Sequence, residues 1–170
     1  MSVWICNGLP KSGKTTFENY VRELYDGPCI IISTIDTVKA IAIELGWNGE
    51  KTPQDRKFLS DLKRLLTEWQ DIPFQKALQE IRRAQLYFKE DPLIFVDSRE
   101  PEEIKRFVDT VGAKTLYVSR PGLSAKHQSN DSDANVEDWV YDVVIYNDLG
   151  LDGLRNRAKN FIKMIERGRH

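Results

Sequence analysis

Gly8-Leu9-Pro10-Lys11-Ser12-Gly13-Lys14-Thr15 follows the apolar run Val3-Trp4-Ile5-Cys6 after a single residue, Asn7. The eight residues match the pattern G-x-x-x-x-G-K-[ST] without a deviation. Glycines allow such a loop to curl around a phosphate with its N–H groups pointing inward. Lys14 would place a cation on the β- and γ-phosphates of a nucleotide, and Thr15 would offer a hydroxyl to Mg²⁺. The stretch therefore predicts a loop that binds ATP with Mg²⁺ through Gly8, Lys11, Ser12, Gly13, Lys14, Thr15 and Thr16.

The residues around this loop predict alternating strands and helices. Helical spacing of apolar residues, as in Phe17, Tyr20, Val21 and Leu24, separates short apolar runs. Such alternation predicts a parallel sheet with helices on both faces. We expect one α/β domain over residues 1–170, with a polar loop over 121–137 and a five-stranded parallel sheet built from 2–6, 29–32, 93–96, 116–118 and 143–145.

Composition restricts the class of protein. A chain of 170 residues suits one domain with a sizeable core. The net charge of -1 and the pI of about 6.2 do not favour a nucleic-acid partner, although a local basic groove is compatible with them. No apolar run has the length of a signal peptide or a membrane span, so we expect a cytoplasmic protein without a membrane partner. The sequence leaves the oligomeric state open, a homodimer included.

A second chemical signal is the aspartate that ends the third predicted strand, Leu93-Ile94-Phe95-Val96-Asp97. In a fold with a phosphate-binding loop, an aspartate at this place lies beside the loop and holds Mg²⁺, often through water. We therefore predict Asp97 as a metal ligand together with Thr15. The alternative is an aspartate that only caps a helix or a turn.

Four segments of the chain, taken in order, resemble the deoxynucleoside monophosphate kinases of bacteriophages, within the nucleoside monophosphate kinase group. They are the phosphate-loop opening, residues 33–39, the Gly46-Trp47 pair followed by Lys51, Arg56, Leu59 and Leu62, and Val96-Asp97-Ser98-Arg99-Glu100-Pro101-Glu102-Glu103-Ile104. The resemblance implies a five-stranded parallel core, a helical monophosphate-binding insert over 34–90 and a lid over 121–137. It also implies transfer of the γ-phosphoryl group from ATP to a small-molecule acceptor, a nucleoside monophosphate.

The resemblance further assigns catalytic roles to Lys14, Asp97, Arg99 and Arg120. Lids of this group usually bring arginines over the transferring phosphate, but residues 121–137 contain Lys126 as their single lysine or arginine. Arg120, or Arg155 and Arg157 beyond the lid, would then have to contribute.

A basic helix face supports an acceptor site. At 3.6 residues per turn from Asp55, Arg56, Ser60, Lys63 and Thr67 share one side, and we expect the opposite side to face the core, namely Phe58, Leu62, Leu65 and Trp69. Two cations and two hydroxyls in a row suit a phosphate monoester, although a solvated face has the same composition. With the resemblance, we predict that Arg56 and Lys63 bind the acceptor phosphate, with Lys51 and Arg99 as further candidates.

Two other functions remain open from the sequence. A kinase acting on a hydroxyl acceptor, such as a modified base in DNA, would need a base to take the hydroxyl proton, and Asp36 could serve. A nucleotide-binding regulatory module with little turnover would agree with the small number of arginines in the lid.

Overall fold

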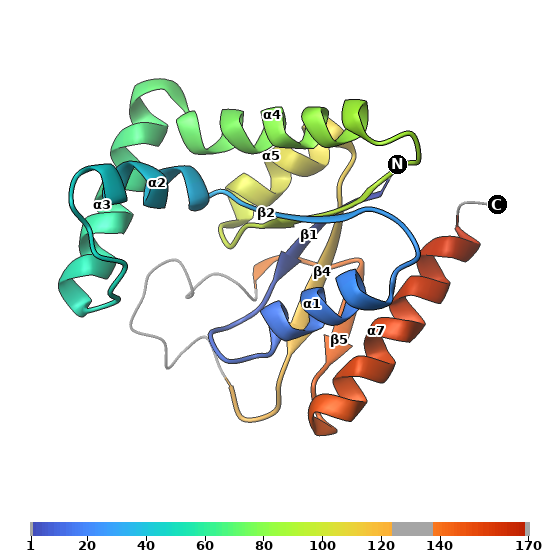
Figure 1. Ribbon diagram of the computed structural model, residues 1–170. Coiled ribbons are helices and arrows are strands. Elements are labelled where there is room, and N and C mark those ends of the chain that lie inside the picture. The colour runs from blue at the N-terminus through green and yellow to red at the C-terminus, as the bar shows by residue number, and fades with distance from the viewer. Residues whose placement is uncertain (1, 124–137, 169–170) are drawn as a thin grey trace.

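The computed structural model describes residues 2–123 and 138–168, so most of the predicted lid over 121–137 lies outside the described residues. Five parallel strands form one sheet in the order β2-β3-β1-β4-β5 (Figure 1). This confirms the predicted five-stranded parallel sheet. The strands are β1 (Ser2–Asn7), β2 (Cys29–Ser33), β3 (Leu93–Asp97), β4 (Lys114–Ser119) and β5 (Val143–Tyr146).

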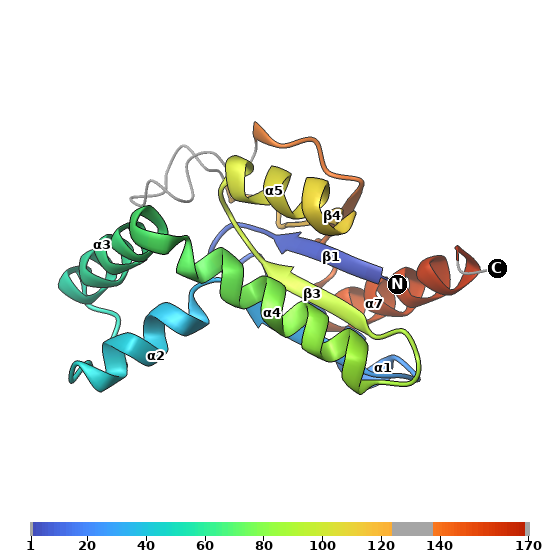
Figure 2. The same ribbon diagram turned by 90° about the horizontal axis from the view of Figure 1, so that it is seen from above.

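Helices cover both faces of the sheet, as the alternating pattern predicted (Figures 1 and 2). One face carries α1 (Lys14–Leu24) and α7 (Gly150–Arg167), and the other carries α4 (Ile72–Tyr87) and α5 (Pro101–Val111). Side chains of β1 alternate between the two cores, because successive residues of a strand point to opposite faces. Trp4 and Cys6 face α1 and α7, and Val3 and Ile5 face α4 and α5.

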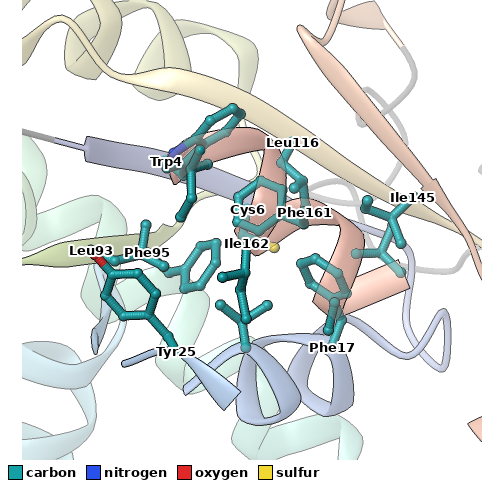
Figure 3. Close-up of a cluster of buried hydrophobic side chains, with 14 of the residues drawn as sticks. Trp4, Cys6, Phe17, Tyr25, Leu93, Phe95, Leu116, Ile145, Phe161 and Ile162 are labelled. Atoms are coloured by element: carbon teal, nitrogen blue, oxygen red, sulfur yellow. The ribbon is translucent and has the colours of Figure 1, made fainter. Parts of the chain in front are cut away.

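Aromatic packing fills the core under α1 and α7 (Figure 3). The Phe161 ring contacts Trp4 edge-on at a centroid distance of 5.0 Å and Phe17 at 5.6 Å. Phe17 comes from the first turn after the phosphate-binding loop and is fully buried. Burial of Phe17 therefore attaches the start of α1, and with it the loop, to the sheet.

Local signals set where the inserted helices begin and end. α3 (Pro53–Gln70) starts with a capping box, in which Thr52 and Asp55 bond each other's backbone and Pro53 occupies the first turn. Asp71 then adopts a left-handed conformation, with φ 54°, and separates α3 from α4. The guanidinium of Arg106 on α5 pairs with the Asp71 carboxylate and lies over the Phe74 ring at 3.8 Å. The break between the two helices is thus held to the core.

The predicted insert over 34–90 divides into two parts. α4 packs on the sheet through side chains such as Phe74 and Ile81, whereas α2 (Asp36–Glu44) and α3 lie beyond the end of the sheet at which β2 leads into α2 (Figures 1 and 2). The prediction that one side of α3 faces the core is wrong for three residues: Phe58, Leu65 and Trp69 are 37%, 59% and 68% exposed.

The physical reason is that α3 packs mainly against the neighbouring helices α2 and α4, whereas α4 packs on the sheet. Its partly buried strip contains Leu59, Leu62, Lys63 and Leu66. The strip is rotated about the helix axis relative to the apolar side that the sequence predicted, and it includes one of the two predicted acceptor-binding cations.

Candidate functional site

The phosphate-binding loop joins the end of β1 to the start of α1, as predicted. A Cβ atom on Gly8 would lie 2.8 Å from the Val118 carbonyl oxygen, so this position requires glycine. Gly13 has φ 97°, and a Cβ atom there would lie 2.5 Å from Asn147 Nδ2. Asn147 donates from Nδ2 to the Ser12 carbonyl at 2.8 Å. The loop is therefore held from β4 and from the segment after β5.

Lys14 lies between two carboxylates. Its Nζ is 2.5 Å from Asp97 Oδ2 and 3.5 Å from Glu18 Oε2, one turn further along α1. Burial opposes the charge on Lys14, but Glu18 and Asp97 outweigh burial and raise the lysine pKa. The juxtaposition arises because Cys6 pairs with Asp97 across the β1–β3 ladder, so both strands end at the same edge. Sequence reasoning predicted that Asp97 would lie beside the loop, and the structure places it there.

Glu18 is a buried acid that the sequence analysis did not single out. Its side chain is 1% exposed on the inner side of α1. Burial first, and repulsion from Asp97 second, raise the pKa of Glu18 to about 8, against which Lys14 acts only in part. Burial beside Asp97 therefore disfavours the charged form of Glu18.

Asp97 and Thr15 have the chemistry of magnesium ligands. Asp97 Oδ1 is buried and has no hydrogen-bond partner among the described residues, and the Thr15 hydroxyl lies in the exposed first turn of α1. Within 2–123 and 138–168, no group of three or more His, Cys, Asp or Glu side chains could hold a metal by itself. Mg²⁺ is commonly held by one carboxylate together with substrate phosphates, and this donor set fits that mode.

A cavity of about 330 Å³ opens beside the loop. It is lined by Arg120, Pro121, Asn147, Asp148, Gly150 and Leu151. Arg120, a predicted catalytic residue, donates from its guanidinium to the Lys11 carbonyl at 3.1 Å and so lies against the loop. The other two arginines predicted beyond the lid are placed differently. Arg157 pairs with Asp148 at 3.5 Å, whereas Arg155 pairs with Glu23, nine residues past Lys14 and thus about 13 Å further along α1.

The predicted acceptor residues lie towards the β2 side of the sheet, around β2, β3 and α3, away from the cavity that follows β4 and β5. Asp36 begins α2, where its carboxylate accepts from the Ser33 N–H at 3.2 Å. Lys63 is partly buried and pairs with Glu103 at 3.3 Å and with Glu100 at 3.9 Å. The same Glu103 oxygen accepts from the hydroxyls of Ser98, at 2.6 Å, and Thr34, at 3.2 Å.

Lys51 and Arg56 lie further out on the insert and are exposed. Neither side chain forms a salt bridge or a hydrogen bond with the phosphate-binding loop in the part of the chain that the structure describes. Arg99 is exposed in the loop after Asp97, and its backbone carbonyl accepts a hydrogen bond from the Asn7 side chain at 3.3 Å. The structure thus pairs Lys14 with Asp97 and places Arg120 against the same loop at Lys11, whereas Lys51 and Arg56 form no such contact with the loop among the described residues.

Comparison with known proteins addresses the fold. No protein-family model and no curated protein matches the chain. A dephospho-CoA kinase from Campylobacter jejuni is similar in structure, with a TM-score of 0.54 and 20% identity, over 96% of this chain and 97% of that one. An APS kinase from Mycobacterium tuberculosis has a TM-score of 0.50 and 14% identity, over 97% and 96%. The chain has a P-loop kinase fold.

Within this P-loop kinase fold, sequence reasoning missed four residues that shape the site: Asn7, Glu18, Glu103 and Asn147. Glu18 could have been found, because it stands between Phe17 and Val21 on the buried side of α1 and one turn from Lys14. Asn147 carried no such signal, since its partner Ser12 lies 135 residues earlier. No helix of the described P-loop kinase fold combines the length and the apolar character needed to cross a membrane.

Proposed function

We propose that the protein is an ATP-dependent kinase that transfers the γ-phosphoryl group to a nucleoside or deoxynucleoside monophosphate. One observation carries the proposal: Lys14 of an unbroken phosphate-binding loop lies 2.5 Å from Asp97, the strand-end carboxylate suited to Mg²⁺. The cavity beside Arg120 and Asn147 is suited to the base of the donor nucleotide. The resemblance to bacteriophage deoxynucleoside monophosphate kinases supplies the acceptor class.

The chain's own residues would act by positioning and by charge neutralisation. Loop N–H groups and Lys14 would bind the donor phosphates, so that Lys14 exchanges Asp97 for a phosphate oxygen. Thr15 and Asp97 would hold Mg²⁺, which when bound neutralises charge on the phosphoryl group. Arg99 and Arg120 would stabilise negative charge from the two sides of the loop. The acceptor phosphate is itself a good nucleophile and needs no strong base.

A specific observation favours a second candidate, a kinase of a hydroxyl acceptor such as a modified base in DNA. Lys63 is already paired with Glu103 and Glu100, so an acceptor phosphate would have to compete with two carboxylates. Asp36 stands at the same end of the sheet with 62% of its side chain exposed and could accept a hydroxyl proton.

The test is an acceptor screen with ATP and Mg²⁺, in which product masses are measured directly. The acceptors are all ribo- and deoxyribonucleoside monophosphates, the matching nucleosides, and DNA with and without hydroxylated bases. Conversion of an acceptor monophosphate to its own diphosphate supports the first proposal, and phosphorylation of DNA alone supports the second; ADP from the donor forms in both cases. ATP binding without transfer to any acceptor would contradict both and favour a regulatory nucleotide-binding module. The Lys14→Ala variant, purified in the same way, controls for contaminating kinases.

A further inference from the structure

The side chain of Asn7 joins three parts of the site. Asn7 is the last residue of β1 and is completely buried. Its Oδ1 accepts from the Gly8 N–H at 2.8 Å, at the entry to the phosphate-binding loop. Its Nδ2 donates to the Tyr141 hydroxyl at 2.8 Å and to the Arg99 carbonyl at 3.3 Å. One buried amide therefore contacts the donor loop, the loop that carries Arg99, and the segment before β5.

Tyr141 holds this amide in one orientation. Its ring stacks on Tyr117 with a centroid distance of 5.0 Å and an angle of 27° between the planes. Tyr117 in turn is the β4 residue paired with Asn7, and it packs against Leu9 of the phosphate-binding loop. Burial raises the pKa of the Tyr141 phenol, so the hydroxyl stays neutral and can accept the amide N–H at any physiological pH.

The geometry leaves the loop entry little freedom. Gly8 lies so close to the Val118 carbonyl that even a methyl group would not fit. Arg99 stands two residues after Asp97, and its backbone carbonyl would lose a hydrogen-bond donor if the Asn7 amide rotated. A buried amide that loses one partner leaves a polar group unsatisfied, and this favours rearrangement of the remaining hydrogen bonds.

We propose that Asn7 and Tyr141 are positioning residues, which fix the Arg99 loop relative to the phosphate-binding loop through the Asn7 side chain. This inference rests on the proposed phosphoryl transfer. In that reaction, stabilising charge must be supplied at a defined distance from the donor phosphates, and displacements of about 1 Å lower the rate strongly. The Asn7 amide sets this distance from the protein side, before either substrate binds.

Tyr141→Phe is the sharpest test, because it removes one oxygen and keeps the ring that stacks on Tyr117. We expect kcat to fall about tenfold, while the KM for ATP changes by less than about twofold, since an interaction needed only in the transition state is lost. The matched control is Tyr20→Phe, which removes a hydroxyl on the side of α1 that faces Arg155. The control should keep wild-type kcat. A Tyr141→Phe enzyme with wild-type kcat would overturn the proposal.

A double-mutant cycle tests whether Tyr141 acts through the Arg99 loop. In an Arg99→Ala background, Tyr141→Phe should cause little further loss of kcat, because the arginine that it positions is absent. Equal losses in both backgrounds would show that Tyr141 acts elsewhere and would overturn the coupling through Arg99.

Amide hydrogen exchange supplies a readout that needs no turnover. ATP is added in EDTA, so that a metal on Asp97 cannot protect the neighbouring backbone. In the wild type we expect ATP to slow exchange in residues 8–16 and in 97–101, and in Tyr141→Phe only in 8–16. Equal protection of 97–101 in both proteins would overturn the inference even if an acceptor is found. The protein could show this difference in protection between wild type and Tyr141→Phe and yet phosphorylate no acceptor. That result would support the positioning role of Asn7 and Tyr141 and would contradict only the proposed function. A wild type that binds no ATP would contradict both.

Discussion

Lys14 Nζ lies 2.5 Å from Asp97 Oδ2, so the candidate phosphate-binding cation and the candidate metal ligand form an ion pair with each other. Lys14 begins α1, one loop after β1, and Asp97 ends β3, and the β1–β3 ladder aligns the ends of these two strands. A second carboxylate oxygen, Glu18 Oε2, lies 3.5 Å from the same lysine nitrogen. In the proposed reaction, nucleotide binding would therefore replace the Lys14–Asp97 pair with a contact between Lys14 and a phosphate oxygen.

Lys14→Ala should lower phosphoryl transfer by about 100-fold or more, because charge stabilisation on the transferred group is lost. The fold should persist, since the lysine borders the loop and fills no space in the apolar core. Transfer rates and circular dichroism would be measured side by side. Lys105→Ala, on the exposed side of α5, is the control and should keep full activity. Wild-type transfer by a folded Lys14→Ala protein would contradict the kinase proposal.

Asp97→Asn tests the metal ligand. We expect the Mg²⁺ concentration for half-maximal activity to rise by about tenfold and kcat to fall, because an amide oxygen holds Mg²⁺ less well than a carboxylate. The melting temperature should change little. Titration of activity with Mg²⁺, together with a thermal melt, gives both quantities. If stability collapses while the Mg²⁺ dependence is unaltered, Asp97 has a purely structural role.

Arg56→Ala should raise the KM for the monophosphate about tenfold and leave the KM for ATP nearly unchanged, because arginine can bind phosphate oxygens bidentately. Lys63→Ala should have a weaker effect of the same kind and should also lower the melting temperature, since Lys63 joins α3 to Glu103. Arg64→Ala on the same helix is the control, because Arg64 pairs with Glu68 on the exposed side. Loss of ATP affinity with retained monophosphate affinity would place α3 on the donor side.

Glu18→Gln should change how stability depends on pH. The pKa of Glu18 is about 8 in the folded protein, above its ordinary value of 4.5, so the folded state holds the proton more tightly than the unfolded state. The stability from the protonated acid is complete below pH 4.5 and is lost as the pH rises towards 8, at up to about 1.4 kcal/mol per pH unit. Glu18→Gln has no acid at this position, so its free energy of unfolding does not fall in this way as the pH rises. Denaturant unfolding of both proteins at several pH values, without nucleotide or Mg²⁺, should show wild type losing stability relative to Glu18→Gln. Parallel pH curves would contradict the assignment.

Asp71→Asn tests the ion pair between Asp71, at the break between α3 and α4, and Arg106 on α5. Asparagine tolerates the left-handed backbone of this position, so the change removes the charge pair with Arg106 and keeps the turn. We expect a loss of roughly 1 kcal/mol in the free energy of unfolding, a modest value because both side chains are partly exposed. Arg106→Lys should cost a similar amount, and the double variant less than the sum.

Arg83→Lys on the outer side of α4 is the control, with an expected change within about 0.5 kcal/mol. Chemical denaturation of the four proteins gives the comparison. Additive effects of Asp71→Asn and Arg106→Lys would show that the two residues do not stabilise the fold as a pair.

Local patterns made the fold and the donor half of the site predictable. The phosphate-binding loop is contiguous from Gly8 to Thr15, and its glycines are required by close backbone approach and by left-handed φ. Asp97 was found because a strand and its terminal carboxylate are adjacent in the chain. Each of these signals needs only neighbouring residues and the rule that parallel strands end at one edge.

Only the tertiary structure decided which residues, distant in the chain, contact the phosphate-binding loop and the Arg99 loop. Tyr141 and Asn7 are 134 residues apart in the chain, and their hydrogen bond depends on β4 lying beside β1 and β5 lying beside β4. The exposure of Phe58, Leu65 and Trp69 likewise follows from α3 packing mainly on the two helices α2 and α4. Helical periodicity identifies an apolar side, but it does not say whether another element covers it, because coverage depends on the placement of the rest of the chain.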